Sequence, residues 1–151
     1  MDGGTWTKHN EGLALVSYRD TLGYWTIGYG HKLQIGPDWS GTTWTQDQAD
    51  SAFEDDYQAA LVGARTDVGI VCWGRLNSPR QAVLADMAFQ MGAEGLGAFR
   101  IALGCLLTGD WNKAATEILN SLYAEQTPQR AKANAEIIRT GDWPWKSLVD
   151  A

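Results

Sequence analysis

Apolar positions along the chain follow two different periods. After residue 45 they recur every three or four residues, as on one face of a helix. Between residues 13 and 35 they form short β-branched and aromatic runs instead. The runs 13–18 and 24–27 are separated by the turn sequence Asp-Thr-Leu-Gly at 20–23, and a third run passes through residues 33–35. This pattern predicts a small β element with two main strands and a third beside them.

A short helix is predicted before the β element, at residues 5–12. Thr5 or Thr7 can cap its start, and Gly12, directly after Glu11, is the usual left-handed stop. Glu11 is therefore expected at the helix C-terminus. Partial negative charge collects at that end of a helix, so the helix dipole favours the protonated acid over the carboxylate.

The longest helical pattern follows a loop rich in glycine, proline and serine at residues 36–42. Thr45 and Gln48 form a capping-box pattern, and the apolar residues after them keep a helical spacing. We expect a helix over residues 46–65. The stretch 66–76 mixes glycines with apolar residues and stays unassigned.

The rest of the chain is predicted to be helical, and Ser78-Pro79 and Thr127-Pro128 mark two of the helix starts. Four helices are expected between cap and stop residues, at 80–91, 96–107, 111–122 and 128–140. The first is apolar on nearly every side and is expected at the centre of the core. A small β element at the front and a helical body behind it make an α+β protein, with residues 1–151 in one domain.

Composition and charge narrow the function classes. Apolar residues make up 44% and charged residues 20% of the chain, which is typical of a folded globular protein. The formal net charge of −6 argues against a nucleic-acid partner, because such binding depends on basic residues that neutralise phosphates. The N-terminus carries no apolar run of signal-peptide length, and no window approaches a membrane span. We therefore expect no signal peptide and no stable membrane association.

The two cysteines, Cys72 and Cys105, lie far apart in the sequence. Neither belongs to a CxxC motif or a Cys/His cluster, so we expect no structural metal. Two buried free thiols are the favoured interpretation, and a disulfide is the alternative.

Three side chains in the front segment suit hydrolysis of an acetal such as a glycosidic bond. Glu11 on the helix end, Asp20 on the turn and Thr26 on the second strand supply an acid, a base and a group that can hold water. Each residue type also has an ordinary explanation. Glu11 can be a simple helix-end acid, Asp20 a turn-forming residue and Thr26 a strand residue.

Four blocks of sequence, in order, sharpen this hypothesis. EGLALVSYRDTLGYWTIGYGH begins at Glu11, MAFQMG at Met87, QTPQRAK at Gln126 and RTGDW at Arg139. Together they resemble the phage-type lysozymes of glycoside hydrolase family 24. The resemblance implies a lysozyme-like fold, in which a long helix joins a small antiparallel β lobe to a larger helical lobe, with a cleft between the lobes. By residue number, the resemblance implies an N-terminal helix at 5–12 that packs on the helical lobe. The β lobe is expected at about 13–45, the linking helix at about 46–65 and the helical lobe at about 66–151.

The resemblance also implies roles for individual residues. Glu11 matches the general acid, and Asp20 with Thr26 matches the groups that position the attacking water. Arg130 matches an arginine that pairs with the catalytic glutamate, and we expect it mainly to orient Glu11. A second supporting pair is expected between His31 and Asp56, holding the β element against the long helix.

Residues that match substrate-binding positions are Gly30, Lys32, Phe89 and Gln90. Gly30 lets a sugar approach the backbone closely, Lys32 is expected to offer main-chain contacts, and Phe89 has plain core packing as its alternative. Ala102 and Glu117 stand where the family pattern has polar cleft residues, so side-chain contacts are not assumed there.

The function implied is that of an endolysin-type lysozyme, a muramidase of phage origin. It would hydrolyse the β-1,4 bond between N-acetylmuramic acid and N-acetylglucosamine in peptidoglycan glycan strands, with inversion, and needs no metal or cofactor. We expect a monomer that waits in the host cytoplasm until a separate holin-type protein gives it access to the cell wall. Two alternatives stay open: a lytic transglycosylase giving 1,6-anhydro products, and a catalytically silent wall-binding domain.

Overall fold

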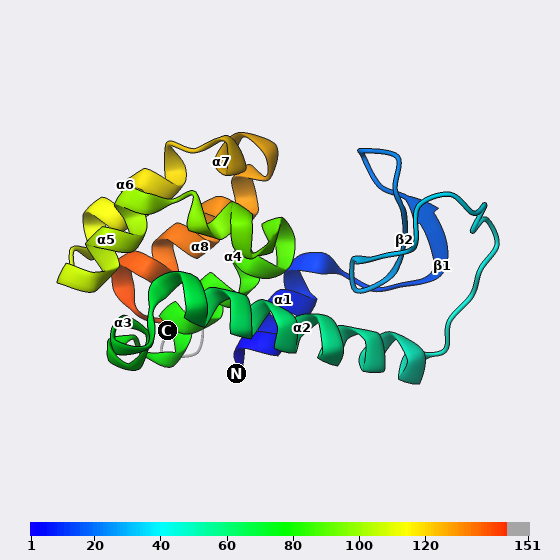
Figure 1. The fold of residues 1–151 in the computed structure, drawn as a ribbon, viewed down its shortest axis with the longest axis horizontal. Coiled ribbons are helices and arrows are strands. Elements are labelled where there is room, and N and C mark those ends of the chain that lie inside the picture. Colours follow the sequence, from blue (N-terminus) through cyan, green and yellow to red (C-terminus); the bar gives the residue numbers. More distant parts are fainter. Residues whose placement is uncertain (145–151) are drawn as a thin grey trace.

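A computed structural model describes residues 1–144 of the chain. The elements in chain order are α1 (Gly3–Glu11), β1 (Ala14–Arg19), β2 (Trp25–Gly28), β3 (His31–Lys32), α2 (Gln46–Val68), α3 (Ile70–Arg75), α4 (Ser78–Gly97), α5 (Arg100–Thr108), α6 (Trp111–Leu119), α7 (Leu122–Gln126) and α8 (Pro128–Thr140). Figure 1 shows the sheet set apart from the helical body, with α2 running between them. The predicted α+β, lysozyme-like fold is confirmed.

Helix α1 begins earlier than predicted and ends where predicted. The carboxylate of Asp2 accepts from the backbone N–H of Thr5 at 2.8 Å, so Asp2 caps the helix and Thr5 lies inside its first turn. The expected cap at Thr5 or Thr7 is therefore wrong. Gly12, with φ of 72°, stops the helix directly after Glu11. The main chain thus places Glu11 at the junction of α1 with the sheet.

The sheet is antiparallel, in the order β1-β2-β3. Thr26 on the central strand is paired with Tyr18 of β1 on one side and with Lys32 of β3 on the other. The central position buries Thr26, whose side chain is only 3% exposed.

The third strand is shorter than expected. β3 ends at Lys32, although the N–H of Leu33 still donates to the carbonyl of Trp25 at 2.9 Å. The chain then leaves the sheet, so that Ile35 is mostly exposed and Gly36 takes a positive φ. A continuous strand through Ile35 is therefore wrong, because no apolar face covers that residue.

Helix α2 has the predicted capping box. The Thr45 hydroxyl accepts from the N–H of Gln48, and the Gln48 side chain accepts from the N–H of Thr45. The helix continues to Val68, beyond the predicted end, and stops at Gly69. The unassigned stretch 66–76 is thus the last turn of α2 followed by the short helix α3.

The start, the middle and the end of α4 differ from the prediction. Asn77, not Ser78, caps α4, and Gly92 breaks its backbone with φ of 77°. The chain resumes a helical course to Gly97, so Leu96 belongs to this element and α5 starts only at Arg100. Glycine therefore interrupts α4 where we expected it to end the helix.

The predicted helix 111–122 is two helices. α6 ends at Leu119, and the Ser121 hydroxyl accepts from the N–H of Ala124 to start α7. A serine cap can open a new helix within two residues of the previous one, and periodicity does not show that break. α8 follows with the predicted bounds and ends at Gly141 in a left-handed conformation.

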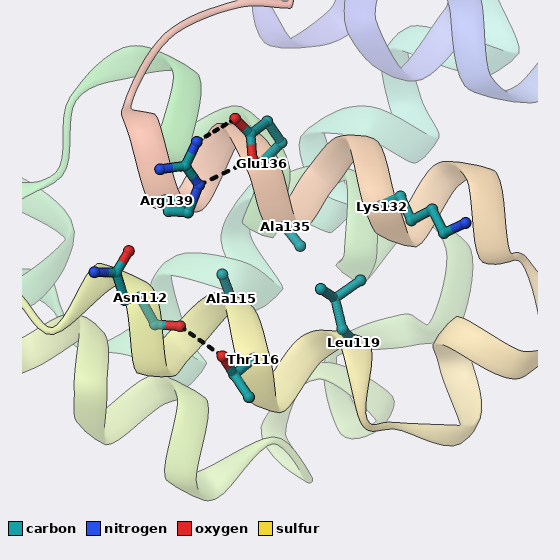
Figure 2. A pocket seen from close by; sticks show the side chains of 8 residues that line it. All are labelled: Asn112, Ala115, Thr116, Leu119, Lys132, Ala135, Glu136 and Arg139. Carbon is teal, nitrogen blue, oxygen red and sulfur yellow. Dashed lines mark hydrogen bonds and ion pairs between the residues drawn. The ribbon is translucent and has the colours of Figure 1, made fainter.

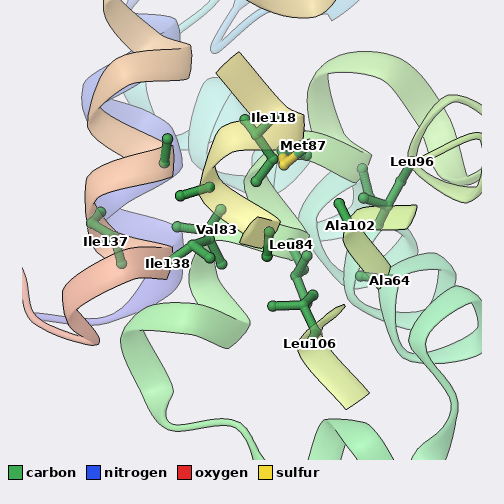
Figure 3. Close-up of a cluster of buried hydrophobic side chains, with 14 of the residues drawn as sticks. Ala64, Val83, Leu84, Met87, Leu96, Ala102, Leu106, Ile118, Ile137 and Ile138 are labelled. Atoms are coloured by element: carbon green, nitrogen blue, oxygen red, sulfur yellow. The ribbon is translucent and has the colours of Figure 1, made fainter. Parts of the chain in front are cut away.

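The core lies among the helices of the body, around buried aliphatic side chains of α4, α5, α6 and α8 (Figure 3). Cys72 and Cys105 are buried there as free thiols, as favoured from the sequence. A second small cluster of Phe53, Tyr57 and Ala85 joins α2 to α4. In residues 1–144 no single helix is both long and apolar enough to cross a membrane; α4 and α5, bent by 100°, pass only as a pair.

Candidate active site

Glu11 lies at the meeting point of three elements. Its Oε1 accepts from Nη1 of Arg130 on α8 at 2.9 Å, and the side chain is 18% exposed. Its Oε2 occupies the space beside the α-carbon of Gly30, in the turn between β2 and β3. The predicted pair between Arg130 and Glu11 is therefore present, and the carboxyl keeps an oxygen that is not bound to the guanidinium.

Arg130 binds a second carboxylate as well as Glu11. Its Nε and Nη2 donate to Asp86 on α4 at 3.0 and 2.8 Å, and Asp86 has no exposed surface. Burial alone would lower the pKa of the guanidinium, but hydrogen bonds and charge from Asp86 and Glu11 raise it. Arg130 is therefore a fixed cation at any working pH.

Asp86 is the site residue that the sequence interpretation missed. It lies within a run of buried residues, 82–88, that is otherwise apolar. Charged residues are almost never fully buried unless they are paired. One acid inside an apolar helix was therefore a signal that a cation elsewhere in the chain reaches the core.

Asp20 holds the turn between β1 and β2 with one of its oxygens. Its Oδ1 accepts from the N–H groups of Leu22 and Tyr24 at 2.9 and 2.8 Å. Within residues 1–144, both side-chain hydrogen bonds of Asp20 go to this oxygen, which leaves Oδ2 to bind water. The turn-forming role is therefore real, and it leaves room for a second role.

Thr26 and Tyr18 form a cross-strand pair between β2 and β1. The Thr26 hydroxyl donates to the carbonyl of Tyr24 at 3.1 Å, which leaves its lone pairs available to a water proton. Burial raises the pKa of the Tyr18 phenol, and the charges of Glu11 and Asp20 raise it further. Tyr18 is thus within electrostatic reach of both carboxylates.

The predicted pair of His31 and Asp56 is also present. Nδ1 of His31 lies 2.6 Å from Oδ2 of Asp56, which joins β3 to α2. The imidazole ring packs beside Trp44 at 5.4 Å between centroids. This contact fixes the sheet against the long helix and does not touch Glu11.

The expected substrate-binding residues lie in different surroundings. Lys32 is exposed, and its ammonium stands 4.9 Å from the ring centroid of Tyr24. Phe89 packs against both hydrophobic clusters, as in its core alternative. Gln90 donates to the Thr127 hydroxyl at 3.1 Å, whereas its own carbonyl oxygen is buried and unpaired.

The positions that depart from the family pattern carry no predicted contact. Ala102 is buried in the main core, so its side chain is unavailable to a ligand. Glu117 is half-buried on α6. A groove of about 400 Å³ lies between α6 and α8 (Figure 2), and none of the predicted site residues lines it. No group of three or more His, Cys, Asp or Glu side chains in the described part of the chain is placed to hold a metal ion.

With Glu11 as the general acid that the family resemblance implies, Gly30→Ala is expected to lower kcat of the expected hydrolysis by tenfold or more. A methyl group at residue 30 would overlap Oε2 of Glu11 and displace the carboxyl, and small displacements of a reacting group can cost about 100-fold. Gly41→Ala is the matched control, because Gly41 has a similar positive φ, 74° against 70°, and open space around it. Both variants should lose roughly 1–2 kcal/mol of stability. Equal kcat values in the two variants would contradict the expectation.

Glu11 and Asp20 stand in opposite environments. Glu11 is largely enclosed and faces a sheet that carries a second acid, whereas Asp20 lies on a turn with an oxygen free for water. Two carboxyl groups with such different surroundings, on a lysozyme-like fold, are the arrangement of glycoside hydrolases. Within that class, the chain belongs to the phage lysozyme family, since the model of that family matches residues 8–133.

Three similar proteins illustrate the range of this family. The pre-baseplate central spike protein Gp5 of Enterobacteria phage T4 is 35% identical over 89% of this chain, which spans only 27% of the spike protein. The probable T4-type lysozyme 2 of Dictyostelium discoideum is 30% identical, over 89% of this chain and 91% of its own length. An endolysin of Acyrthosiphon pisum secondary endosymbiont phage 1 is 26% identical, over 82% of this chain and 79% of its own.

Proposed function

We propose that the protein hydrolyses the β-1,4 bond between N-acetylmuramic acid and N-acetylglucosamine in bacterial peptidoglycan, with inversion at the anomeric carbon. The observation that carries this proposal is the position of the Glu11 carboxyl. Arg130 holds it at the end of α1, and one of its oxygens lies beside Gly30. Relatives named lysozyme and endolysin support the choice of substrate.

In the proposed reaction Glu11 is the general acid. It donates its proton to the glycosidic oxygen as the bond to the anomeric carbon breaks, so that the leaving sugar departs as an alcohol. Arg130 holds the carboxyl in place, and the resulting carboxylate stays paired with the guanidinium. The carboxylate formed by proton donation therefore keeps a charge-assisted hydrogen bond, which favours this step.

Asp20 supplies the base in the same proposal. Its Oδ2 accepts a proton from a water molecule, which attacks the anomeric carbon from the face opposite the leaving group. The Thr26 hydroxyl orients that water through its lone pairs. A base that acts through water inverts the anomeric configuration, whereas a direct nucleophile would retain it.

Product analysis on purified peptidoglycan tests the proposal. We expect reducing ends formed with inverted configuration, read by NMR in the first minutes before mutarotation. Anhydro ends would identify a lytic transglycosylase, which needs no attacking water. Absence of cleavage would identify a silent wall-binding domain. Either result would overturn the proposal.

We also propose that the protein acts in host cell lysis as a monomer, released to the wall from the host cytoplasm with the help of a separate holin-type protein. The relative named endolysin supports this context. The spike-protein relative shows that a similar stretch also exists inside a much longer phage protein. Lysis of host cells that express residues 1–151, expected only when the inner membrane is also permeabilised chemically, tests the need for a holin-type protein.

A further inference from the structure

Asp86 is the centre of a buried hydrogen-bond network. Its two carboxylate oxygens accept from Nε and Nη2 of Arg130 at 3.0 and 2.8 Å, from Nδ2 of Asn134 at 2.8 Å and from Nδ2 of Asn10 at 3.3 Å. These four donors satisfy a carboxylate that has no exposed surface. Such a group is stable only while its cation is present.

The network is fixed to the core through Asn134. Oδ1 of Asn134 accepts from Nε1 of Trp6 at 2.9 Å, and its Nδ2 also donates to the hydroxyl of Tyr123 at 2.9 Å. Trp6, Asn134 and Tyr123 are all buried. Asp86 is therefore held rigidly, and its bidentate contact fixes the plane of the Arg130 guanidinium, with Nη1 directed at Glu11.

The charges of this group bear directly on proton donation. Arg130 carries one positive charge, and Asp86 cancels it. With Asp86 ionised, the three groups carry no net charge when Glu11 holds its proton and one negative charge when Glu11 is ionised. Without Asp86, a protonated Glu11 would leave the buried guanidinium unpaired, and the site would favour the carboxylate.

No other titratable group described around Glu11 takes the place of Asp86 in balancing the charge of Arg130. Burial raises the pKa of Tyr18 on β1 and, to about 12, that of Tyr123 on α7, so both phenols are neutral at working pH. On α1 itself, Lys8 is bound to Asp50, and His9 stacks on Trp6. The negative charge of Asp20 also acts on Tyr18, whose pKa it raises. Asp86 is the anion in direct contact with Arg130 besides Glu11 itself.

We propose that Asp86 is a positioning residue for the general acid: it fixes Arg130 in the orientation that binds Glu11, and it offsets the charge of the guanidinium, which would otherwise favour loss of the Glu11 proton. The proposal rests on the assignment of Glu11 as general acid. It adds a residue from the buried face of α4 to the site.

Exchanging the partners of the Asn10–Asp86 hydrogen bond tests the proposal. For Asp86→Asn we expect the alkaline limb of the pH–kcat profile to move to lower pH by about one unit, and kcat near neutral pH to fall roughly tenfold, with little change in KM. The double variant Asn10→Asp/Asp86→Asn returns an anion to the network around the guanidinium. Its alkaline limb should lie at the same pH as that of the parent. Asn10→Asp alone should move it to higher pH.

Asp50→Asn is the control for loss of one acid from the same region, because Asp50 binds Lys8 and not Arg130. Its profile should match that of the parent. An Asp86→Asn profile that keeps its shape, or lost activity that the double variant does not restore, would reduce Asp86 to a structural role. If Asp86→Asn does not fold, the pH–kcat profile of Asn10→Asp is the test. An alkaline limb at the same pH as in the parent would overturn the proposal.

A readout without turnover separates this proposal from the assignment of function. The ionisation of Glu11 is followed directly by NMR of its labelled carboxyl carbon in the parent, Asp86→Asn and Asn10→Asp. If the parent does not cleave peptidoglycan, the function proposal fails on its own. The carboxyl titration still shows whether Asp86 controls the ionisation of Glu11, and identical titrations in all three proteins would refute it.

Discussion

Replacing Glu11 by Gln is expected to lower kcat on peptidoglycan by about 10²–10⁴-fold, the usual worth of a positioned acid. The amide cannot donate a proton of comparable acidity to the glycosidic oxygen. Its carbonyl can still accept from Nη1 of Arg130, so the geometry survives. The measurement is the initial rate of reducing-end release at the optimal pH of the parent protein.

Stability should not fall in the same variant. With Glu11 neutral, Arg130 is left with Asp86 alone, and this pair of opposite charges is already fully bonded. We therefore expect the Tm of Glu11→Gln to equal or exceed that of the parent, as is common where an active site is optimised for function rather than stability. The control is Glu94→Gln, since Glu94 is exposed on the far segment of α4 and should affect neither rate nor Tm. A Glu11→Gln protein of parental activity would remove Glu11 from the mechanism.

The sequence predicted helix ends correctly where one residue type determines the local backbone geometry. Gly12 and Gly141 end their helices as expected, because each takes a positive φ and donates its N–H to a carbonyl of the last turn. The capping box at Thr45 has both of its hydrogen bonds. These features depend on neighbours within four residues, so a single sequence contains them.

The helix boundaries that were predicted wrongly lie where several residues could cap the helix equally well. Asp2, Thr5 and Thr7 can all cap a helix, and the carboxylate of Asp2 binds both the N–H and the hydroxyl of Thr5. Ser121 looked like the interior of a helix because apolar spacing continues across it. In both cases a side-chain cap sets the boundary, and local periodicity does not show which of the possible caps forms its hydrogen bond.

The site was predictable only in part for the same reason. Glu11, Asp20 and Thr26 lie within one short segment and were found together. Asp86 and Arg130 are 44 residues apart, and α4 and α8 bring them into contact. A resemblance supplied Arg130, and the lone acid in an apolar run was a signal at Asp86, but the contact between the two is visible only once the helices are packed.

Replacing Asp20 by Asn is expected to lower kcat by a factor similar to that of Glu11→Gln, about 10²–10⁴. The amide oxygen can keep both hydrogen bonds from Leu22 and Tyr24, whereas an amide nitrogen at the place of Oδ2 cannot accept a proton from water. We therefore expect normal folding with lost hydrolysis. Asp20→Ala should lose the same activity and, in addition, roughly 1 kcal/mol of stability, because two turn hydrogen bonds disappear.

Asp38→Asn is the matched control for this substitution. Asp38 accepts from the N–H of Ser40 at 2.9 Å in an exposed turn, and asparagine can keep that bond as well. The control should retain full activity, so a loss confined to Asp20→Asn is a loss of the base and not of a turn. A hydrolase in which water attacks the anomeric carbon needs that base, whereas a transglycosylase does not. Asp20→Asn with parental turnover would therefore eliminate the inverting mechanism, while Glu11 would remain the proton donor in either reaction.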